Sequence, residues 1–190
     1  MAVVRDPESK KRSLLDAALV EFAAKGLVGT RTEDIASRAG CSTGLVYTYF
    51  GSKEGLFDAV LDDITARTVE LMPITPEDLP GYAVRLYEAG ASSPEVGRFV
   101  AWYQLQRGAD AEPRTSVEEA TREKIADVTA ALDAGLISSP LSPGELVLTV
   151  QTIARMWATQ PREIITAVGG SEESRRDAVR SAVQALLKST

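Results

Sequence analysis

The side chains best suited to chemistry gather between residues 30 and 53, in the segment TRTEDIASRAGCSTGLVYTYFGSK. Hydroxyl groups, glycines and a lysine alternate there with apolar residues. Hydroxyls can donate and accept hydrogen bonds and an ammonium group can donate them, but a serine or threonine needs an activating base to act as a nucleophile. The segment therefore favours recognition by hydrogen bonding over catalysis.

The rest of the chain lacks the groups that an active site or metal site would need. There is no histidine and only one cysteine, Cys41, which excludes Ser–His and Cys–His pairs and any cysteine-cluster metal site. Carboxylates such as Glu118 and Glu119 are adjacent in sequence and do not face each other across a site. We expect no catalytic residues, no metal and no cofactor, and treat an all-helical enzyme as a remote alternative.

Two short helices are predicted within this segment. Thr30 and Glu33 have the spacing of a capping box, and they would start a helix over residues 32–39 that Gly40 ends. Ser42 would cap a second helix over residues 43–49. With small Ala36 where the two helices cross, the pattern predicts a helix-turn-helix.

Apolar residues elsewhere recur at spacings of three and four, and strand-type alternation is absent. The chain is therefore expected to be all-α, with an N-terminal three-helix domain over 1–56 and a second helical domain over 57–190. Gly169 and Gly170 are expected in a loop before the last helix. About nine helices are predicted in total, over residues 8–25, 32–39, 43–49, 53–71, 77–90, 93–107, 115–134, 142–158 and 172–188.

Residues 12–60 resemble the DNA-binding domain of TetR family transcriptional regulators. The resemblance implies a helix-turn-helix that binds a double-stranded DNA operator, followed by a helical domain that binds a small molecule and dimerises. The matching residues are Leu15-Asp16-Ala17-Ala18, Phe22-Ala23, Gly26, Gly29-Thr30, Asp34-Ile35-Ala36, Ala39-Gly40, Tyr47, Tyr49-Phe50, Ser52-Lys53-Glu54 and Leu56.

On this basis the second short helix should offer short side chains to base edges in the major groove, while hydroxyls and Lys53 contact phosphates. Ser52 would cap the next helix and place its amides, with Lys53, around one phosphate. The Lys10-Lys11-Arg12 cluster would add nonspecific attraction or simply form a soluble start to the first helix. The expected DNA-binding residues are Thr32, Ser42, Thr43, Gly44, Leu45, Tyr47, Thr48, Tyr49 and Lys53.

The chain departs from the family pattern at several of these positions. The family often has a basic or amide residue at Thr43, threonine at Leu45 and a polar group such as histidine at Thr48, so hydrogen-bond readout should be sparse. Leu45 could touch thymine methyl groups, but packing inward is slightly favoured. Glu33 could accept a hydrogen bond from cytosine, although capping explains it more simply.

Simpler structural interpretations stay open for other residues. Tyr47 and Tyr49 could be half-buried aromatic residues, and Lys53 could be an ordinary solvated lysine. Cys41, where the family usually has valine, is interpreted as a small core residue; a redox sensor would need an exposed, activated thiolate.

Aromatic and sulfur-bearing residues are concentrated after residue 80 and could line a cavity for a largely apolar ligand. Each of them could equally belong to an ordinary core. The expected ligand-binding residues are Tyr87, Phe99, Trp102, Tyr103, Gln106, Arg155 and Met156.

A homodimer is expected, because one helix-turn-helix reads only a few base pairs. The family resemblance places its interface on the last two long helices, whose apolar stripes could instead seal the core of a single chain. The stripes are Leu146, Val150 and Ile153, and Val179, Val183 and Leu186.

The charge distribution agrees with a polyanion partner at the N-terminal end only. The whole chain carries a net charge of −6, whereas residues 1–53 have a small excess of Lys and Arg. We find no signal peptide or membrane span and expect a cytoplasmic protein. The favoured function is a repressor released from a palindromic operator by a small, largely apolar molecule; the alternative is a ligand-insensitive DNA-binding protein.

Overall fold

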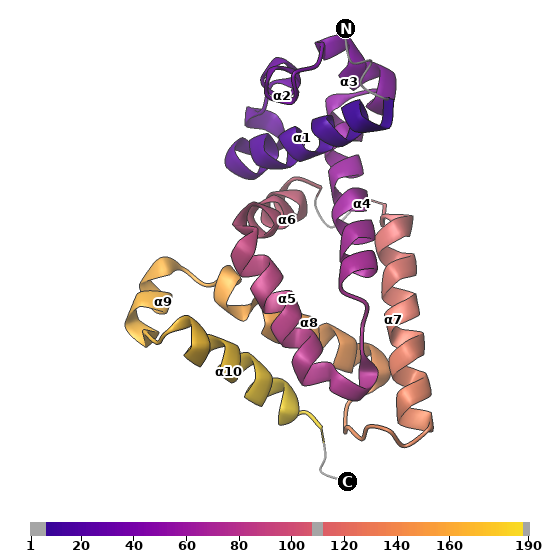
Figure 1. Ribbon diagram of the computed structural model, residues 1–190, viewed down its shortest axis with the longest axis vertical. Coiled ribbons are helices and arrows are strands. Elements are labelled where there is room, and N and C mark those ends of the chain that lie inside the picture. The colour runs from indigo at the N-terminus through magenta and orange to yellow at the C-terminus, as the bar shows by residue number, and fades with distance from the viewer. Residues whose placement is uncertain (1–6, 108–111, 188–190) are drawn as a thin grey trace, which may run out of the picture. The chain divides into compact units, whose positions relative to one another are not determined.

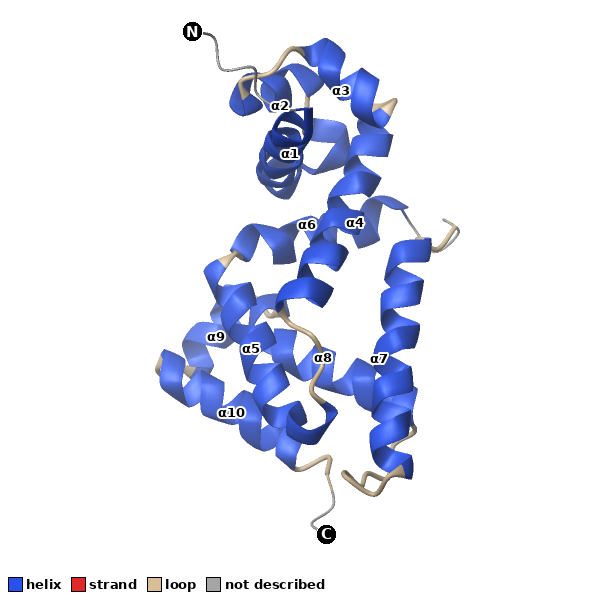
Figure 2. Cartoon of the chain, turned by 45° about the vertical axis from the view of Figure 1, so that its right-hand side comes forward, coloured by secondary structure: helices blue, strands red, loops and turns tan. Residues whose placement is uncertain are grey.

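The computed structural model describes residues 7–107 and 112–187, and within these ranges all regular structure is helical (Figure 2). The contacts divide the chain into two units: Met1–Ala66 with Glu95–Arg114, and Arg67–Pro94 with Thr115–Thr190. The elements, labelled in Figure 1, are α1 (Pro7–Gly29), α2 (Thr32–Ala39), α3 (Thr43–Phe50), α4 (Lys53–Leu71), η1 (Pro76–Asp78), α5 (Leu79–Ser92), α6 (Pro94–Arg107), α7 (Thr115–Asp133), α8 (Pro143–Thr159), α9 (Arg162–Val168) and α10 (Glu172–Gln184).

The first unit is organised around an aromatic cluster. The ring of Phe57 lies edge-on to Phe22 at 4.9 Å and stacks on Tyr103 at 5.3 Å between centroids. Phe99 of α6 is fully buried in the same cluster. Buried aromatic contacts of this kind join α1, α4 and α6, so the first unit draws on a helix far along the chain.

This division differs from the domain boundary expected at residue 56. The first core extends through Phe57 and Val60 of α4 and takes in α6. The apolar face of α4 continues past residue 56 without interruption, and the aromatic residues of α6 cover it. The ranges expected for the two domains also include residues 1–6, which lie outside the described part of the chain.

The second unit has its own core. Leu79 and Tyr82 of α5, Val128 of α7, Leu146 of α8 and Val179 of α10 are each at most 1% exposed within it. Among the described elements, α5 packs against both α8 and α10, and α7 packs against α8. This unit is therefore a helical bundle with α5 and α8 as its central members.

Most helix boundaries agree with those predicted from sequence. The bounds of α2 and α4 match, and α3 ends one residue later than expected. Helix α9 is absent from the prediction because it has only seven residues and follows Pro161 directly; the loop expected at Gly169 and Gly170 comes after it. The expected end of the last helix, residue 188, lies outside the described residues.

Candidate nucleic-acid interface

Helices α2 and α3 are held in a fixed arrangement by a short turn and by buried apolar contacts. Gly40 ends α2 in the left-handed conformation at φ 63°, and the Cys41 N–H donates to the Ala36 carbonyl at 2.9 Å. Ile35 and Val46 are fully buried against the first core. The predicted helix-turn-helix is therefore present, with one face of α3 anchored and the other free.

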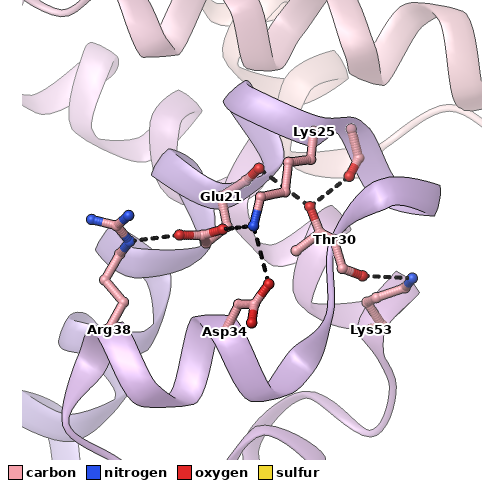
Figure 3. Close-up of polar contacts among 7 residues, drawn as sticks. Glu21, Lys25, Thr30, Asp34, Arg38 and Lys53 are labelled. Carbon is pink, nitrogen blue, oxygen red and sulfur yellow. Dashed lines mark hydrogen bonds and ion pairs between the residues drawn. The ribbon is translucent and has the colours of Figure 1, made fainter.

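The capping box predicted for α2 is wrong. Arg31 is the N-cap residue of α2 and has no side-chain capping bond. The buried Thr30 hydroxyl instead lies 2.7 Å from the Gly26 carbonyl and 3.2 Å from the Glu21 carbonyl (Figure 3). Gly26 has φ 68° and ψ 179°, a conformation that interrupts α1 and brings its carbonyl within reach of Thr30.

The outer face of α3 carries several of the predicted groove-facing residues. Gly44, Tyr47 and Thr48 are exposed, as is Ser42 at the N-cap. Thr43 is half-buried, and Leu45 is half-buried and packs against the first core. The favoured inward packing of Leu45 is confirmed, and α3 presents a narrow polar face around Gly44 and Thr48.

Two hydroxyls predicted to contact phosphate lie together, that of Tyr47 on α3 and that of the buried Thr32 on α2. The Tyr47 hydroxyl is 3.3 Å from the Thr32 hydroxyl, and 51% of Tyr47 is exposed. Tyr49 is half-buried and packs against the first core, which agrees with the alternative given for it. The structure thus joins Tyr47 with Thr32 and separates Tyr49 from them.

Lys53 does not extend freely into solvent. Its ammonium donates to the Thr30 carbonyl at 3.0 Å (Figure 3), and the predicted cap of α4 is confirmed by the Gly55 N–H, which donates to the Ser52 hydroxyl at 2.9 Å. Arg12 of the N-terminal basic cluster is likewise paired, with Asp63 of α4 at 2.6 Å. Both cations are positioned by the fold.

An ion-pair network that sequence analysis missed ties α1 to α2. The buried Glu21 carboxylate accepts hydrogen bonds from Lys25 at 2.7 Å and from Arg38 at 2.8 Å, and Lys25 also contacts Asp34 at 3.0 Å (Figure 3). These hydrogen bonds, that from Lys25 first, lower the pKa of Glu21 below its ordinary value. The spacing of four between Glu21 and Lys25 was the available signal.

Four predicted ligand-binding residues belong instead to the first unit. Phe99 is fully buried in the aromatic cluster, and the Tyr103 hydroxyl lies 3.3 Å from Asp58. The Gln106 side chain accepts the Leu27 N–H at 2.6 Å, and Trp102 packs over Gly26. These four side chains therefore support α1 and α4 near the helix-turn-helix.

The other three predicted ligand-binding residues lie in the second unit. Tyr87 is buried in its core and Met156 is half-buried beside it. Arg155 is exposed and hydrogen-bonds Gln151 one turn earlier in α8. The seven residues thus form two groups, because the apolar residues of α6 cover the first core.

The apolar stripes proposed for dimerisation are largely used within the chain. Leu146, Val150, Val179 and Val183 are fully buried in the second core. They therefore seal a single chain, which was the alternative given for them. None of the described helices combines the length and the hydropathy of a membrane-spanning segment.

Comparisons with known proteins agree with this geometry. Residues 14–60 match the family model described as bacterial regulatory proteins, tetR family, and residues 78–185 match the tetracyclin repressor-like C-terminal domain. The HTH-type transcriptional repressor SCO4008 of Streptomyces coelicolor is 28% identical, covering 96% of this chain and 97% of that protein. The HTH-type transcriptional regulator RutR of Escherichia coli K12 is 30% identical, covering 88% and 82% respectively.

A solved structure gives the same assignment. The transcriptional regulator SCO4942 from Streptomyces coelicolor superposes with a TM-score of 0.82 at 31% identity, covering 94% of this chain and 98% of that chain. The match extends over both units and includes the helix-turn-helix described above. The chain therefore belongs to the TetR family of bacterial transcriptional regulators.

Proposed function

We propose that this regulator inserts the outer face of α3 into the major groove of an operator and represses transcription until a small molecule binds the second unit. The observation that carries the DNA-binding part is the free polar face of α3, with Gly44 and Thr48 exposed opposite the fully buried Val46. A helix whose opposite face is packed against the core in this way can offer side chains to base edges without changing its own position. Repression is the function named for the relative SCO4008.

Phosphate contacts would fix the register of α3 in the groove. Tyr47 and Thr32 place two hydroxyls within 3.3 Å of each other at one edge of the helix-turn-helix. Lys53 lies at the start of α4, where free amides favour an anion, and its bond to the Thr30 carbonyl sets its position before DNA arrives. These groups are suited to hold one strand of the duplex backbone.

A homodimer would bring two such faces to half-sites roughly 34 Å apart, or a multiple of that spacing. The inner stripes of α8 and α10 are buried within one chain, which favours their outer faces for contact between two chains. Leu148 on α8 is 65% exposed, and Ala178 and Ala182 on α10 are small enough for a close helix approach. We assign the interface to this surface.

The DNA assignment is tested with operator fragments selected from genomic DNA by the purified protein. Lys53→Ala should weaken binding to all fragments and lower the salt slope by about 1, and Tyr47→Phe should weaken binding about fivefold. Arg122→Ala, which removes an exposed cation paired with Glu118 on α7, is the control and should bind like the parent protein. Unchanged affinity and salt slope in both variants would refute the phosphate contacts.

The dimer is tested by light scattering on Leu148→Asp. A carboxylate at this exposed position should convert the dimer to a monomer while leaving the helical content unchanged, because Leu148 is not part of the second core. Operator affinity should then fall by at least tenfold. A Leu148→Asp protein that stays dimeric would place the interface elsewhere.

A further inference from the structure

Tyr82 of α5 carries a polar group for which the described part of the chain supplies no partner. The side chain is 1% exposed, and its hydroxyl has no hydrogen bond. Leaving a buried donor and acceptor unsatisfied destabilises the folded chain, and most buried hydroxyls in native proteins are paired. The burial also raises the pKa of Tyr82, so the hydroxyl stays protonated and able to donate.

Lys124 of α7 is placed where an apolar residue would be expected. It lies four residues after Ala120 and four before Val128, both of which are buried, so it shares the inner face of α7 with them. Its side chain makes no ion pair or hydrogen bond with any described residue. Burial, followed by the positive charge of Arg155, lowers the pKa of Lys124, whereas Glu123 opposes this more weakly.

Arg155 of α8 completes the group. Its guanidinium hydrogen-bonds only the neutral Gln151 among the described residues, and it retains solvent contact although desolvation lowers its pKa. Helix α8 packs against both α5 and α7, and Met156 and Ile125, which follow Arg155 and Lys124 in sequence, border the core that buries Tyr82. The electrostatic interactions of Arg155 with Tyr82 and with Lys124 agree with this placement. The other charge close to Tyr82 is Arg85, which is bonded to Thr75.

A half-buried ammonium and a buried hydroxyl that lack a bonded partner among the described residues disfavour the folded chain, and a ligand anion would remove that cost. We propose that Tyr82, Lys124 and Arg155 form the recognition site for the anionic oxygens of an amphipathic ligand, a carboxylate or phosphate attached to an apolar body. The half-buried Ile125 and Met156 that border the second core supply apolar contacts for that body. This proposal rests on the proposed function and specifies the chemistry of the effector.

The test measures binding to the full-length protein without DNA. Thermal shift and tryptophan fluorescence titrations would compare decanoate, decyl phosphate and 1-decanol, which share an apolar chain and differ in the head group. We expect at least one of the two anions to bind at least tenfold more tightly than decanol, and the two anions together show whether carboxylate or phosphate is preferred. Equal binding of all three, or no binding by either anion, would overturn the proposal.

Substitutions distinguish a role of these three side chains in ligand recognition from a role in stability alone. Lys124→Met and Arg155→Met should each lower anion affinity at least tenfold and leave decanol binding unchanged. Tyr82→Phe should lower anion affinity about threefold. Lys124→Met should also raise the melting temperature of the ligand-free protein, because it removes a desolvated charge that has no partner. Arg122→Met, on the exposed face of the same helix, is the matched control and should change neither quantity.

These outcomes are independent of DNA binding. If the variants bind anions like the parent protein, the recognition site is refuted while operator binding by α3 still stands. If the protein binds decanoate through Lys124 and Arg155 but selects no genomic fragment, the proposed function fails and the anion site remains. Lys124→Met with a lower melting temperature and unaltered anion affinity would assign Lys124 a purely structural role.

Discussion

The two units differ in whether their buried polar groups have hydrogen-bond partners. In the first unit the Glu21 carboxylate is bonded by two cations, the Thr30 hydroxyl lies within reach of two carbonyls, and Leu27 donates to a side chain of α6. In the second unit the hydroxyl of Tyr82 and the indole N–H of Trp157 are buried with no hydrogen-bond partner in the described structure. Among the described residues, these buried polar groups of the first unit are thus paired within the chain, whereas those two groups of the second unit are not.

The largest effect on stability should come from removing one large buried side chain from each core in turn. Phe57→Ala removes the central ring of the first aromatic cluster and should cost about 3–5 kcal/mol of stability. Leu146→Ala, at an equally buried position in the second core, should cost about 2–5 kcal/mol. Hydrogen exchange measured peptide by peptide should show protection lost first in α1–α3 for Phe57→Ala, and first in α5 and α10 for Leu146→Ala. Identical patterns would mean that the units do not unfold separately.

A smaller effect is expected at the interruption of α1. Gly26 adopts φ 68° with ψ 179°, a region that other residues rarely occupy, and an added Cβ would lie 2.9 Å from the Trp102 ring. Gly26→Ala should therefore cost about 1–3 kcal/mol. Operator affinity should fall as well, since Thr30 and Lys53 are positioned through this turn. Gly90→Ala, where an added Cβ would meet nothing within 4 Å, is the control.

The smallest effect concerns the ion pairs of Glu21. Because its pKa is lowered in the folded state, the carboxylate stabilises the protein above the ordinary value of 4.5 and this contribution is lost as the pH falls through the folded pKa. Glu21→Gln should cost about 1 kcal/mol at pH 7, a modest amount because Lys25 and Arg38 are half exposed. Denaturant titrations at pH 7 and pH 3.5 should show the difference from the parent protein shrinking at low pH. A difference in unfolding free energy that is the same at both pH values would contradict the role given to the Glu21 ion pairs.

Sequence reasoning succeeded where the determining signals are local. Gly40 and the spacing of Ile35, Ala36 and Val46 were sufficient to place α2 and α3, because helix ends and apolar faces depend on neighbouring residues. The spacing left two interpretations open for Leu45, contact with thymine methyl groups or inward packing, and the structure has it packed against the first core. Short-range patterns therefore suffice to locate the exposed face of α3.

Sequence reasoning failed where residues distant in the chain decide the outcome. The assignment of α6 to the first unit depends on contacts such as Leu27 with Gln106, which are 79 positions apart. The capping role expected for Thr30 is wrong because the interruption at Gly26, which redirects its hydroxyl, leaves no local sequence pattern. The local sequence of α6 does not indicate in which of the two cores its aromatic residues are buried.

The place of α6 in the first unit has a consequence for biosynthesis. As the chain leaves the ribosome, α1 to α4 emerge together, but Phe99 and Tyr103 follow only after the whole of α5 has been made. Until then Phe57 lacks two of its aromatic neighbours. The unit that carries the helix-turn-helix is thus discontinuous in sequence, and a nascent or truncated chain that stops before residue 99 would expose the apolar surface around Phe57 that α6 covers in the folded chain.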